Sequence, residues 1–376
     1  MTDWSAPESD VLATIRDVLE SGDRAVLATI VDVEGSAYRR PGAKMIVREE
    51  GGGIGHITAG CLEDEVERLS TEILETGEAR IETYDLRPEA EDDVWGLGVG
   101  CNGIIDVLLE PLDESYREAI DRYDAGKDVG VLTVLDGDDE AIGARAFYDP
   151  VTDSFDPDQA FPTGILDRLG EVTAELTEAG NADTYDVDNF SVFVDGIAAP
   201  DDLVVVGSGP DAGPIAELGS NVGFRVTVAG FRGASATEER FPDADEVVAT
   251  SPARLRDSVD FDADTYVVVA THNYVDDRIA IDELLQTDAP YVGLMGPRER
   301  FEEMLEDFEA EGRTFSEAEL EALYTPVGLD LGSGSPYGIA TSIVSEVLAV
   351  SNGRDPKHLK DREGRIHDRV ELAPED

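Results

Sequence analysis

Short apolar runs dominate the chain after residue 200, and they set the strongest limit on its fold. Five runs are almost free of polar residues and alternate with helical segments: LVVVG (203–207), FRVTVAG (224–230), EVVAT (246–250), TYVVVAT (265–271) and YVGLMG (291–296). A strand that is apolar on both faces belongs in a parallel sheet covered by helices on each side. A final helix, capped by Ser335, closes this region. We therefore predict a Rossmann-like parallel-sheet domain over residues 199–353.

The first part of the chain mixes helices and strands in a less regular order. Helical spacing of apolar residues predicts helices over 9–21 and from residue 62 to Gly77. Predicted strands are AVLATIVDV (25–33), AKMIVR (43–48), IIDVLL (104–109) and a hairpin of VGVLTVL and AIGARAFYD. The segment 149–189 is polar and acidic, with one predicted helix near 163–179. We assign 1–198 to an N-terminal mixed α/β domain, with its core at 11–112 and a less clearly defined extension at 113–198, and 354–376 to a tail.

The charge balance excludes several kinds of partner. The chain carries 84 acidic against 29 basic residues, a formal net charge of −55. Carboxylates spread along the whole sequence favour a surface adapted to a high-salt cytoplasm, where screening limits repulsion to about 3 Å at molar salt. Nucleic acid is not expected as a partner, because binding it requires a basic face. No stretch approaches the roughly 20 apolar residues of a membrane span and no signal peptide opens the chain, so we expect a cytoplasmic protein.

The turn after the first strand of the second domain has the pattern of a dinucleotide fingerprint. VVVGSGPDAG places Gly207 and Gly209 between a strand and a helix, where glycines permit a tight turn and helix amides meet a phosphate. Two departures weaken this interpretation: Pro210 removes an amide, and Gly230 stands where a ribose-binding acid is usual, although Arg232 is available to a phosphate. A domain whose glycines only allow close helix packing fits the sequence equally well.

Further polar residues follow two other strands of this domain, in ATHNYVDD and GLMGPRER. Open α/β sheets bind ligands at the carboxyl ends of their strands. We therefore expect His272, Asn273 and Arg298 to project into one crevice beside the Gly207 turn. Helix capping and surface ion pairs are the alternative for the acidic residues that come next.

The most basic stretch of the first domain is SAYRRPGAK. It gathers Arg39, Arg40 and Lys44 within six positions of a chain that has few bases. Such a cluster predicts an anion site, because arginine binds phosphate in a bidentate manner. The alternative is a solvated turn whose bases pair with nearby carboxylates such as Glu34.

Both cysteines have glycines close by. Cys61, in HITAGCLEDEV, stands at the start of a predicted helix, whose dipole favours the thiolate while three adjacent acids oppose it. Cys101 lies among four glycines in VWGLGVGCNG, which permit a ligand or another backbone to come close. Two cysteines are too few for a disulfide framework, or for a zinc site without other ligands, and an ordinary structural thiol is the alternative for each.

Six motifs, taken in order, closely resemble the XdhC/CoxI family of accessory proteins of xanthine dehydrogenase and related molybdenum hydroxylases: VDVEGSAYRRPGAKMIV, AGCLEDEV, VWGLGVGCNG, ATHNY, YVGLMGPRER and YTPVGLDLG. The resemblance implies a chaperone more than a catalyst. Such a protein binds the molybdenum cofactor (molybdopterin), protects it during sulfuration and delivers it to an apo-hydroxylase of the xanthine dehydrogenase or CO dehydrogenase type. The implied partners are that hydroxylase and a sulfur donor such as a cysteine desulfurase, and we expect a homo-oligomer.

Carried over by position, the resemblance implies a set of cofactor-binding residues and no catalytic residue. Cys61 and Cys101 are the candidates for contact with molybdenum or its sulfur. Family members carry GAGH where this chain has GSGP, and an acid where it has Gly230. An NAD(P)-dependent oxidoreductase built on the second domain is the alternative function. The implied cofactor-binding residues are Arg39, Arg40, Lys44, Cys61, Cys101, Gly207, Gly209, Asp211, His272, Asn273 and Arg298.

Overall fold

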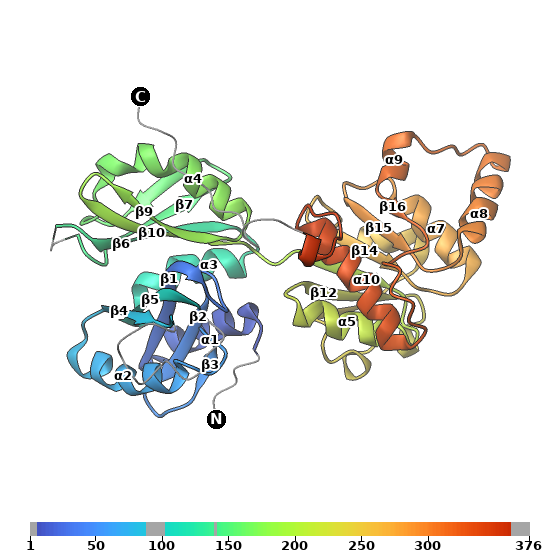
Figure 1. Cartoon of the computed structure of the whole chain (residues 1–376). Coiled ribbons are helices and arrows are strands. Elements are labelled where there is room, and N and C mark those ends of the chain that lie inside the picture. The colour runs from blue at the N-terminus through green and yellow to red at the C-terminus, as the bar shows by residue number, and fades with distance from the viewer. Residues whose placement is uncertain (1–5, 88–101, 139–140, 362–376) are drawn as a thin grey trace. The chain divides into compact units, whose positions relative to one another are not determined.

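The chain divides into two compact units that separate between Ala199 and Pro200 (Figure 1). The computed structural model describes residues 6–87, 102–138 and 141–361. The predictions made for Cys101 and for the end of the tail lie outside these residues. Within the described ranges, no helix has both the length and the apolar character needed to cross a membrane.

The first unit contains two antiparallel sheets of five strands each. One has the order β3-β2-β1-β5-β4, from β1 (Ala25–Ser36), β2 (Lys44–Arg48), β3 (Gly53–Gly55), β4 (Arg80–Asp85) and β5 (Asn102–Pro111). The other has the order β8-β7-β6-β10-β9, from β6 (Val129–Asp136), β7 (Arg145–Asp149), β8 (Ser154–Pro157), β9 (Ala182–Val187) and β10 (Phe190–Ile197). The predicted strands and hairpin are confirmed. Strands β3, β4, β8, β9 and β10 are not predicted from the sequence; in β9, ADTYDV, acidic residues interrupt the apolar ones.

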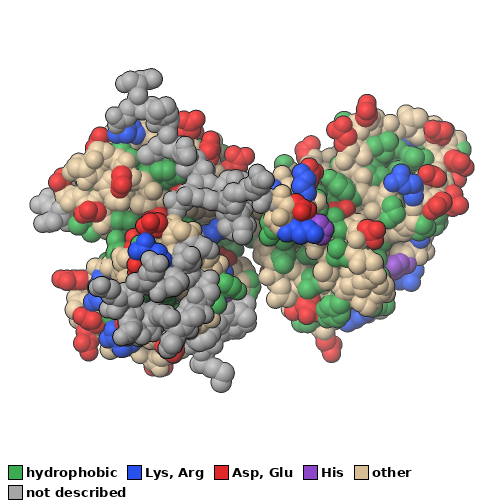
Figure 2. Space-filling view, viewed as in Figure 1, with side chains coloured by type: hydrophobic (Ala, Val, Ile, Leu, Met, Phe, Trp, Pro, Cys, Tyr) green, Lys and Arg blue, Asp and Glu red, His purple; other side chains and the backbone are tan. Residues whose placement is uncertain are grey.

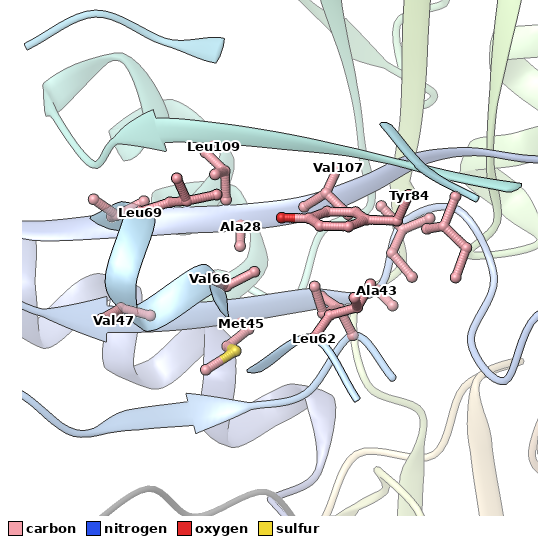
Figure 3. Packing of buried hydrophobic residues seen from close by; sticks show 14 of the residues in the cluster. Ala28, Ala43, Met45, Val47, Leu62, Val66, Leu69, Tyr84, Val107 and Leu109 are labelled. Atoms are coloured by element: carbon pink, nitrogen blue, oxygen red, sulfur yellow. The ribbon is translucent and has the colours of Figure 1, made fainter. Parts of the chain in front are cut away.

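Helices α1 (Glu8–Ser21), α2 (Glu63–Thr76), α3 (Arg117–Asp124) and α4 (Leu166–Glu178) complete the first unit. The first two end as predicted, at Gly22 and Gly77, each of which adopts the left-handed conformation that favours glycine. Helix α2 lies over the first sheet. The side chains that form the core between them include Leu62, Val66, Leu69, Ala28, Met45 and Val107 (Figure 3).

The second unit contains a six-stranded parallel sheet in the order β13-β12-β11-β14-β15-β16. Its strands are β11 (Asp202–Val206), β12 (Arg225–Gly230), β13 (Glu246–Ala249), β14 (Thr265–Val269), β15 (Tyr291–Leu294) and β16 (Leu323–Tyr324). Numbered along the chain, this is the order 3-2-1-4-5-6 of a doubly wound Rossmann sheet. The predicted fold class, a mixed α/β region followed by a Rossmann-like domain, is confirmed.

Helices cover both faces of this parallel sheet. Helices α5 (Ala212–Asn221) and α10 (Pro336–Ser351) pack on one face, and α6 (Leu255–Ser258), α7 (Tyr274–Leu284) and α8 (Arg298–Ala310) on the other, with α9 (Glu317–Glu321) before β16. Ser335 caps α10 as predicted, because its Oγ accepts a hydrogen bond from the Gly338 amide at 3.1 Å. Chain order reverses between β11 and β14, and ligands of such sheets bind at that point.

Candidate functional site

The loop between β1 and β2 carries the basic cluster of the first unit. Arg39 donates from Nη2 to Oε2 of Glu8 at 2.7 Å, whereas Arg40 donates from Nη1 to the amide oxygen of Asn181 at 3.2 Å. Desolvation, and then the positive charge of Arg39, lower the pKa of Arg40. Arg40 has no carboxylate within ion-pair distance among the residues that the structure describes. Two adjacent guanidinium groups that share only one carboxylate have the electrostatic character of an anion site.

Lys44, the third basic residue of the predicted cluster, points away from solvent. Its Nζ lies 2.8 Å from Oδ2 of Asp195 on β10 and donates to the Gly42 carbonyl at 3.0 Å. Both charged side chains are only 4% exposed. Burial by itself lowers the pKa of Lys44, but the Asp195 carboxylate outweighs it, so the net pKa is raised. A ligand would therefore have to break this ion pair to reach the Lys44 ammonium group.

A second buried ion pair joins the same two sheets, but here the cation lies on the second sheet and the anion on the first. Arg145 of β7 contacts Oε2 of Glu110 on β5 at 2.5 Å, and its guanidinium lies 5.0 Å from the ring centroid of Tyr116. Burial raises the pKa of Glu110 and of Tyr116. Each sheet thus contributes one cation and one anion to the interface, and Lys44 belongs to this interface.

Cys61 lies directly before α2 in a tightly hydrogen-bonded turn. Thr58 Oγ1 accepts hydrogen bonds from the amides of Cys61 and Leu62 at 3.0 and 3.1 Å and donates to Oε2 of Glu63 at 2.6 Å. Burial raises the pKa of the Glu63 carboxyl, but its hydrogen bonds, led by that from the Thr58 hydroxyl, lower it overall. A buried, ionised carboxylate therefore belongs to the same hydrogen-bonded turn as Cys61.

One ring contact links the Arg39–Arg40 loop to the segment before Cys61, and both segments pack against the same core. Ala37 and Cys61 both pack against the core of the first sheet. The ring centroid of Tyr38 lies 5.9 Å from that of His56, and the Tyr38 side chain is 62% exposed. The sequence singles out neither Tyr38 nor this contact, because nothing local indicates that the two loops meet.

Cys101 falls outside the described residues. Strand β5 begins at the next residue, Asn102, whose backbone pairs with Ser36 at the end of β1. The chain thus enters β5 beside the Arg39–Arg40 loop. Among the described residues, no three His, Cys, Asp or Glu side chains gather closely enough to hold a metal ion. Contacts of Cys61 and Cys101 with molybdenum or sulfur remain predictions.

In the second unit, glycines let the turn before α5 pack against the end of β14. Gly207 has a φ of 139°, and a Cβ there would lie 2.4 Å from the carbonyl oxygen of Ala270. A Cβ on Gly209 would lie 3.5 Å from Cδ2 of His272. The first approach and the positive φ explain why glycine is needed at position 207, whereas at Gly209 a Cβ would make only an ordinary contact with His272.

A histidine and an aspartate meet above this turn. His272 Nε2 lies 2.8 Å from Oδ2 of Asp211, and the backbone of His272 has a φ of 56°, in the left-handed region. Its side chain is 49% exposed. Asn273 instead caps α7, since its Oδ1 accepts from the amides of Val275 and Asp276 at 3.0 and 3.1 Å. The structure thus brings His272 to the Gly207 turn, while the Asn273 side chain is engaged in the cap.

A buried ion pair supports the turn that carries His272. Asp277 of α7 is 1% exposed and accepts hydrogen bonds from Thr271 Oγ1 and from Nη2 of Arg300 on α8. Burial raises the pKa of Asp277 overall, against the effect of its hydrogen bond to Thr271 and the charge of Arg300. Asp277 therefore has a structural role, but in a buried ion pair and not in the cap or surface pair expected as the alternative, and the sequence does not identify Arg300 as its partner.

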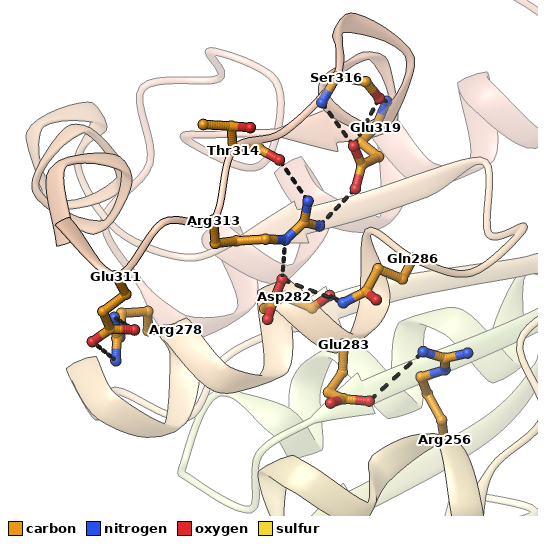
Figure 4. Close-up of polar contacts among 10 residues, drawn as sticks. All are labelled: Arg256, Arg278, Asp282, Glu283, Gln286, Glu311, Arg313, Thr314, Ser316 and Glu319. Carbon is orange, nitrogen blue, oxygen red and sulfur yellow. Dashed lines mark hydrogen bonds and ion pairs between the residues drawn. The ribbon is translucent and has the colours of Figure 1, made fainter. Parts of the chain in front are cut away.

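Most of the described arginines have carboxylate partners, as expected for a chain with so many acidic side chains (Figure 2). Arg313, for example, contacts Asp282 at 2.7 Å and Glu319 at 2.6 Å (Figure 4). Arg298 and Arg232 differ. They follow the ends of β15 and β12, are exposed, and have no carboxylate within ion-pair distance among the residues 6–87, 102–138 and 141–361.

The end of β12 leaves no room for an acidic side chain. A Cβ on Gly230 would lie 2.5 Å from Cβ of Ala236 and 3.2 Å from Cβ of Ser208. The loop that contains Ala236 is held there, since Ser208 Oγ lies 2.9 Å from Oγ of Ser235. Dinucleotide-binding domains normally place at this position the acid that binds the ribose hydroxyl. The end of β12 therefore lacks both the carboxylate of the dinucleotide fingerprint and the space to hold one.

Comparison with known proteins identifies relatives of both units. The model of the XdhC and CoxI family matches residues 8–85, and that of the XdhC Rossmann domain matches residues 203–347. A probable xanthine dehydrogenase subunit from Bacillus subtilis (strain 168) is 31% identical over 336 residues, 88% of this chain and 94% of that protein. The molybdenum cofactor insertion chaperone PaoD of Escherichia coli (strain K12) is 30% identical over 139 residues, 34% of this chain and 42% of PaoD. The crystal structure of a xanthine dehydrogenase from Bacillus halodurans is similar with a TM-score of 0.73 and 30% identity, covering 92% of this chain and 96% of that one.

Proposed function

This chain belongs to the XdhC and CoxI family, and on that premise we propose that it binds the molybdenum cofactor, assists its sulfuration and delivers it to a molybdenum hydroxylase of the xanthine dehydrogenase or CO dehydrogenase type. Its partners are then the apo-hydroxylase and a sulfur donor such as a cysteine desulfurase. The similarity to a molybdenum cofactor insertion chaperone supports this function.

The observation that carries the proposal is the arginine pair of the first unit. Arg40 lies beside Arg39 without a carboxylate partner among the described residues, in a chain with 84 acidic residues. Glu8 offsets only one of the two adjacent positive charges, so a further anion beside Arg40 would relieve their repulsion. The molybdenum cofactor has a terminal phosphate, and guanidinium groups are well suited to bind phosphate.

The neighbouring residues support this assignment in different ways. Arg39 and Arg40 would hold the phosphate, and Cys61 would present its sulfur from the adjoining turn. Thr58 and Glu63 fix the backbone of that turn through their hydrogen bonds. The cofactor, when bound, supplies the dithiolene-held molybdenum that is sulfurated. Lys44 is assigned no contact because its ammonium is already neutralised inside the protein.

The test is the cofactor content of the protein, purified anaerobically in high salt from a host that makes the cofactor. We expect the wild type to carry molybdenum together with a pterin that fluoresces after oxidation. Arg40→Ala should lower both by about 10-fold or more, because a hydrogen bond to a charged group contributes about 1.5–3 kcal/mol. Wild-type protein that contains neither molybdenum nor pterin would refute the proposal.

Two further variants control this measurement. Arg68→Ala removes an arginine of α2 that is 64% exposed and paired with Glu65, and it should leave the cofactor content unchanged. Glu8→Gln removes the carboxylate that occupies Arg39 and should increase cofactor retention. A decrease with Glu8→Gln would show that the Arg39 charge does not face the ligand.

The cysteines are tested in the same assay. Cys61→Ala and Cys101→Ala should lower the molybdenum content if their sulfur atoms contact the metal or its sulfur ligand. Cofactor retention at the wild-type level in both variants would show that neither sulfur atom is needed to hold the cofactor and that these segments only shape the site.

A further inference from the structure

We infer that the second unit binds a nucleotide whose ribose carries an extra phosphate, as in NADPH, and that Arg232 recognises this phosphate. The site consists of residues of the second unit alone, so the inference is independent of the function proposed above.

The sheet supplies the frame for such a ligand. Chain order reverses between β11 and β14, and the turn from β11 into α5 approaches the end of β14 closely at Gly207. A Cβ on Gly213, the second residue of α5, would meet no atom within 4 Å, and the Asp211–His272 pair lies directly before the helix. Doubly wound sheets bind the pyrophosphate of a dinucleotide at this place.

The acid that recognises an unphosphorylated ribose is missing from the end of β12. That recognition uses a carboxylate that accepts hydrogen bonds from the ribose hydroxyls. Here the position is Gly230, and Ala236 and Ser208 fill the space into which a side chain would extend. The chain therefore lacks both the acid and the room for it.

The loop after β12 offers arginines instead. Arg232 follows the strand by two residues, and its side chain is exposed with no carboxylate partner in the described part of the chain. Arg240 lies on the same loop and donates from Nη1 to the Ser235 carbonyl at 3.1 Å. The hydroxyl group of Ser235 also borders this loop, 2.9 Å from that of Ser208. Arginine beside the ribose position is the arrangement that accepts a ribose phosphate.

The net charge of the chain strengthens this argument. A formal charge of −55 repels an anionic ligand from most of the surface, so binding requires local cations that are not already neutralised. Arg232 provides such a charge at the ribose end. Arg298, after β15, provides one on the other flank of the switch point, where it cannot distinguish the two kinds of ribose.

The inference is tested by titrating the full-length protein with NADPH and with NADH at one fixed salt concentration, following nucleotide fluorescence. We expect wild type to bind NADPH about 10- to 100-fold more tightly, the range for one charge-assisted bidentate contact. Arg232→Ala should abolish this difference, whereas Arg298→Ala should weaken both nucleotides equally. Arg225→Ala is the matched control: it removes an arginine from the opposite end of β12, where Asp202 contacts it at 2.6 Å, and should leave the ratio unchanged.

Competition separates a nucleotide site from a general anion site. Adenosine 2′,5′-bisphosphate should displace NADPH, and inorganic phosphate at equal ionic strength should not. The inference is overturned if inorganic phosphate displaces NADPH equally well, if wild type binds NADH as tightly as NADPH or binds neither at millimolar concentration, or if Arg232→Ala keeps the wild-type ratio. The molybdenum and pterin content of the same protein reports separately on the first unit.

Discussion

Lys44→Met should destabilise the first unit far more than the loss of an exposed lysine would. Lys44 and Asp195 are each 4% exposed and lie 2.8 Å apart, so the substitution leaves a buried carboxylate without its cation. Methionine has a similar length and needs no polar partner, which limits the cavity that is left. The change in the free energy of unfolding therefore reports mainly the loss of the charge and only slightly the change in packing.

The magnitude follows from this geometry. At 2.8 Å and an effective dielectric constant of about 20, two unit charges attract by about 6 kcal/mol. Part of that attraction offsets the desolvation of both groups, and breaking one partner of a buried pair costs about 3–5 kcal/mol. The pKa of Lys44 is raised in the folded protein, so its stabilisation is complete below the unfolded value of 10.5 and is lost as the pH rises through the higher folded value.

Urea unfolding of wild type, Lys44→Met and the double variant Lys44→Met/Asp195→Leu measures the cost of breaking the ion pair and the cost of replacing it. The double variant should be close to wild type, because replacing a buried pair by apolar residues is often neutral or stabilising. Lys127→Met, at an exposed lysine of the same unit, should change stability by less than about 0.5 kcal/mol. A loss below about 1 kcal/mol for Lys44→Met, or a double variant as unstable as the single one, would refute the reasoning.

The same double variant decides the functional assignment of Lys44. If the folded double variant retains the molybdenum cofactor, Lys44 acts in the interface between the sheets. If it folds and loses the cofactor, the ligand role that the sequence predicts for Lys44 is correct.

Three other predictions concern the Cys61 turn, the surface and the end of β12. Glu63→Gln should cost about 1–3 kcal/mol at neutral pH through lost hydrogen bonds to Thr58; because the pKa of Glu63 is lowered, the difference from wild type in urea unfolding should shrink as pH falls below 4.5. The melting temperature should rise as KCl is added toward molar concentration, because screening relieves the repulsion within a charge of −55; an unchanged melting temperature would contradict adaptation to high salt. Gly230→Asp should destabilise by about 1–3 kcal/mol through overpacking against Ala236; adding Ala236→Gly should recover part of this and shift the nucleotide preference toward NADH, as measured by thermal unfolding and the fluorescence titration.

Much of the fold was predictable because its signals are local. Strand β14 is buried along its whole length, and a run such as TYVVV with no charged residue and three consecutive valines predicts that environment directly. Gly22 and Gly77 end helices in the left-handed conformation, which few other residues adopt. The second sheet of the first unit was predicted only in part: the β6–β7 hairpin was recognised, but β9 carries acidic residues among its apolar ones and resembles loop sequence.

The candidate sites divide in the same way. Gly207, Gly209 and His272 could be placed at one sheet edge from the sequence, because parallel strands end on the same side. The partner of His272, Asp211, and the ion pair of Arg300 with Asp277 depend on side chains of different elements meeting. Local sequence patterns contain no signal for such a meeting.

The sequence by itself determined the fold class, the glycine turn before α5 and the unusual gathering of arginines at Arg39 and Arg40, because each depends on residues close together in the chain. Only the tertiary structure decided which of those cations are available to a ligand. Asp195, distant in sequence, neutralises Lys44, while Arg40 and Arg232 have no carboxylate partner among the described residues. The physical reason is that charge pairing acts through space, over a few ångströms between elements whose approach the packing of the apolar core sets.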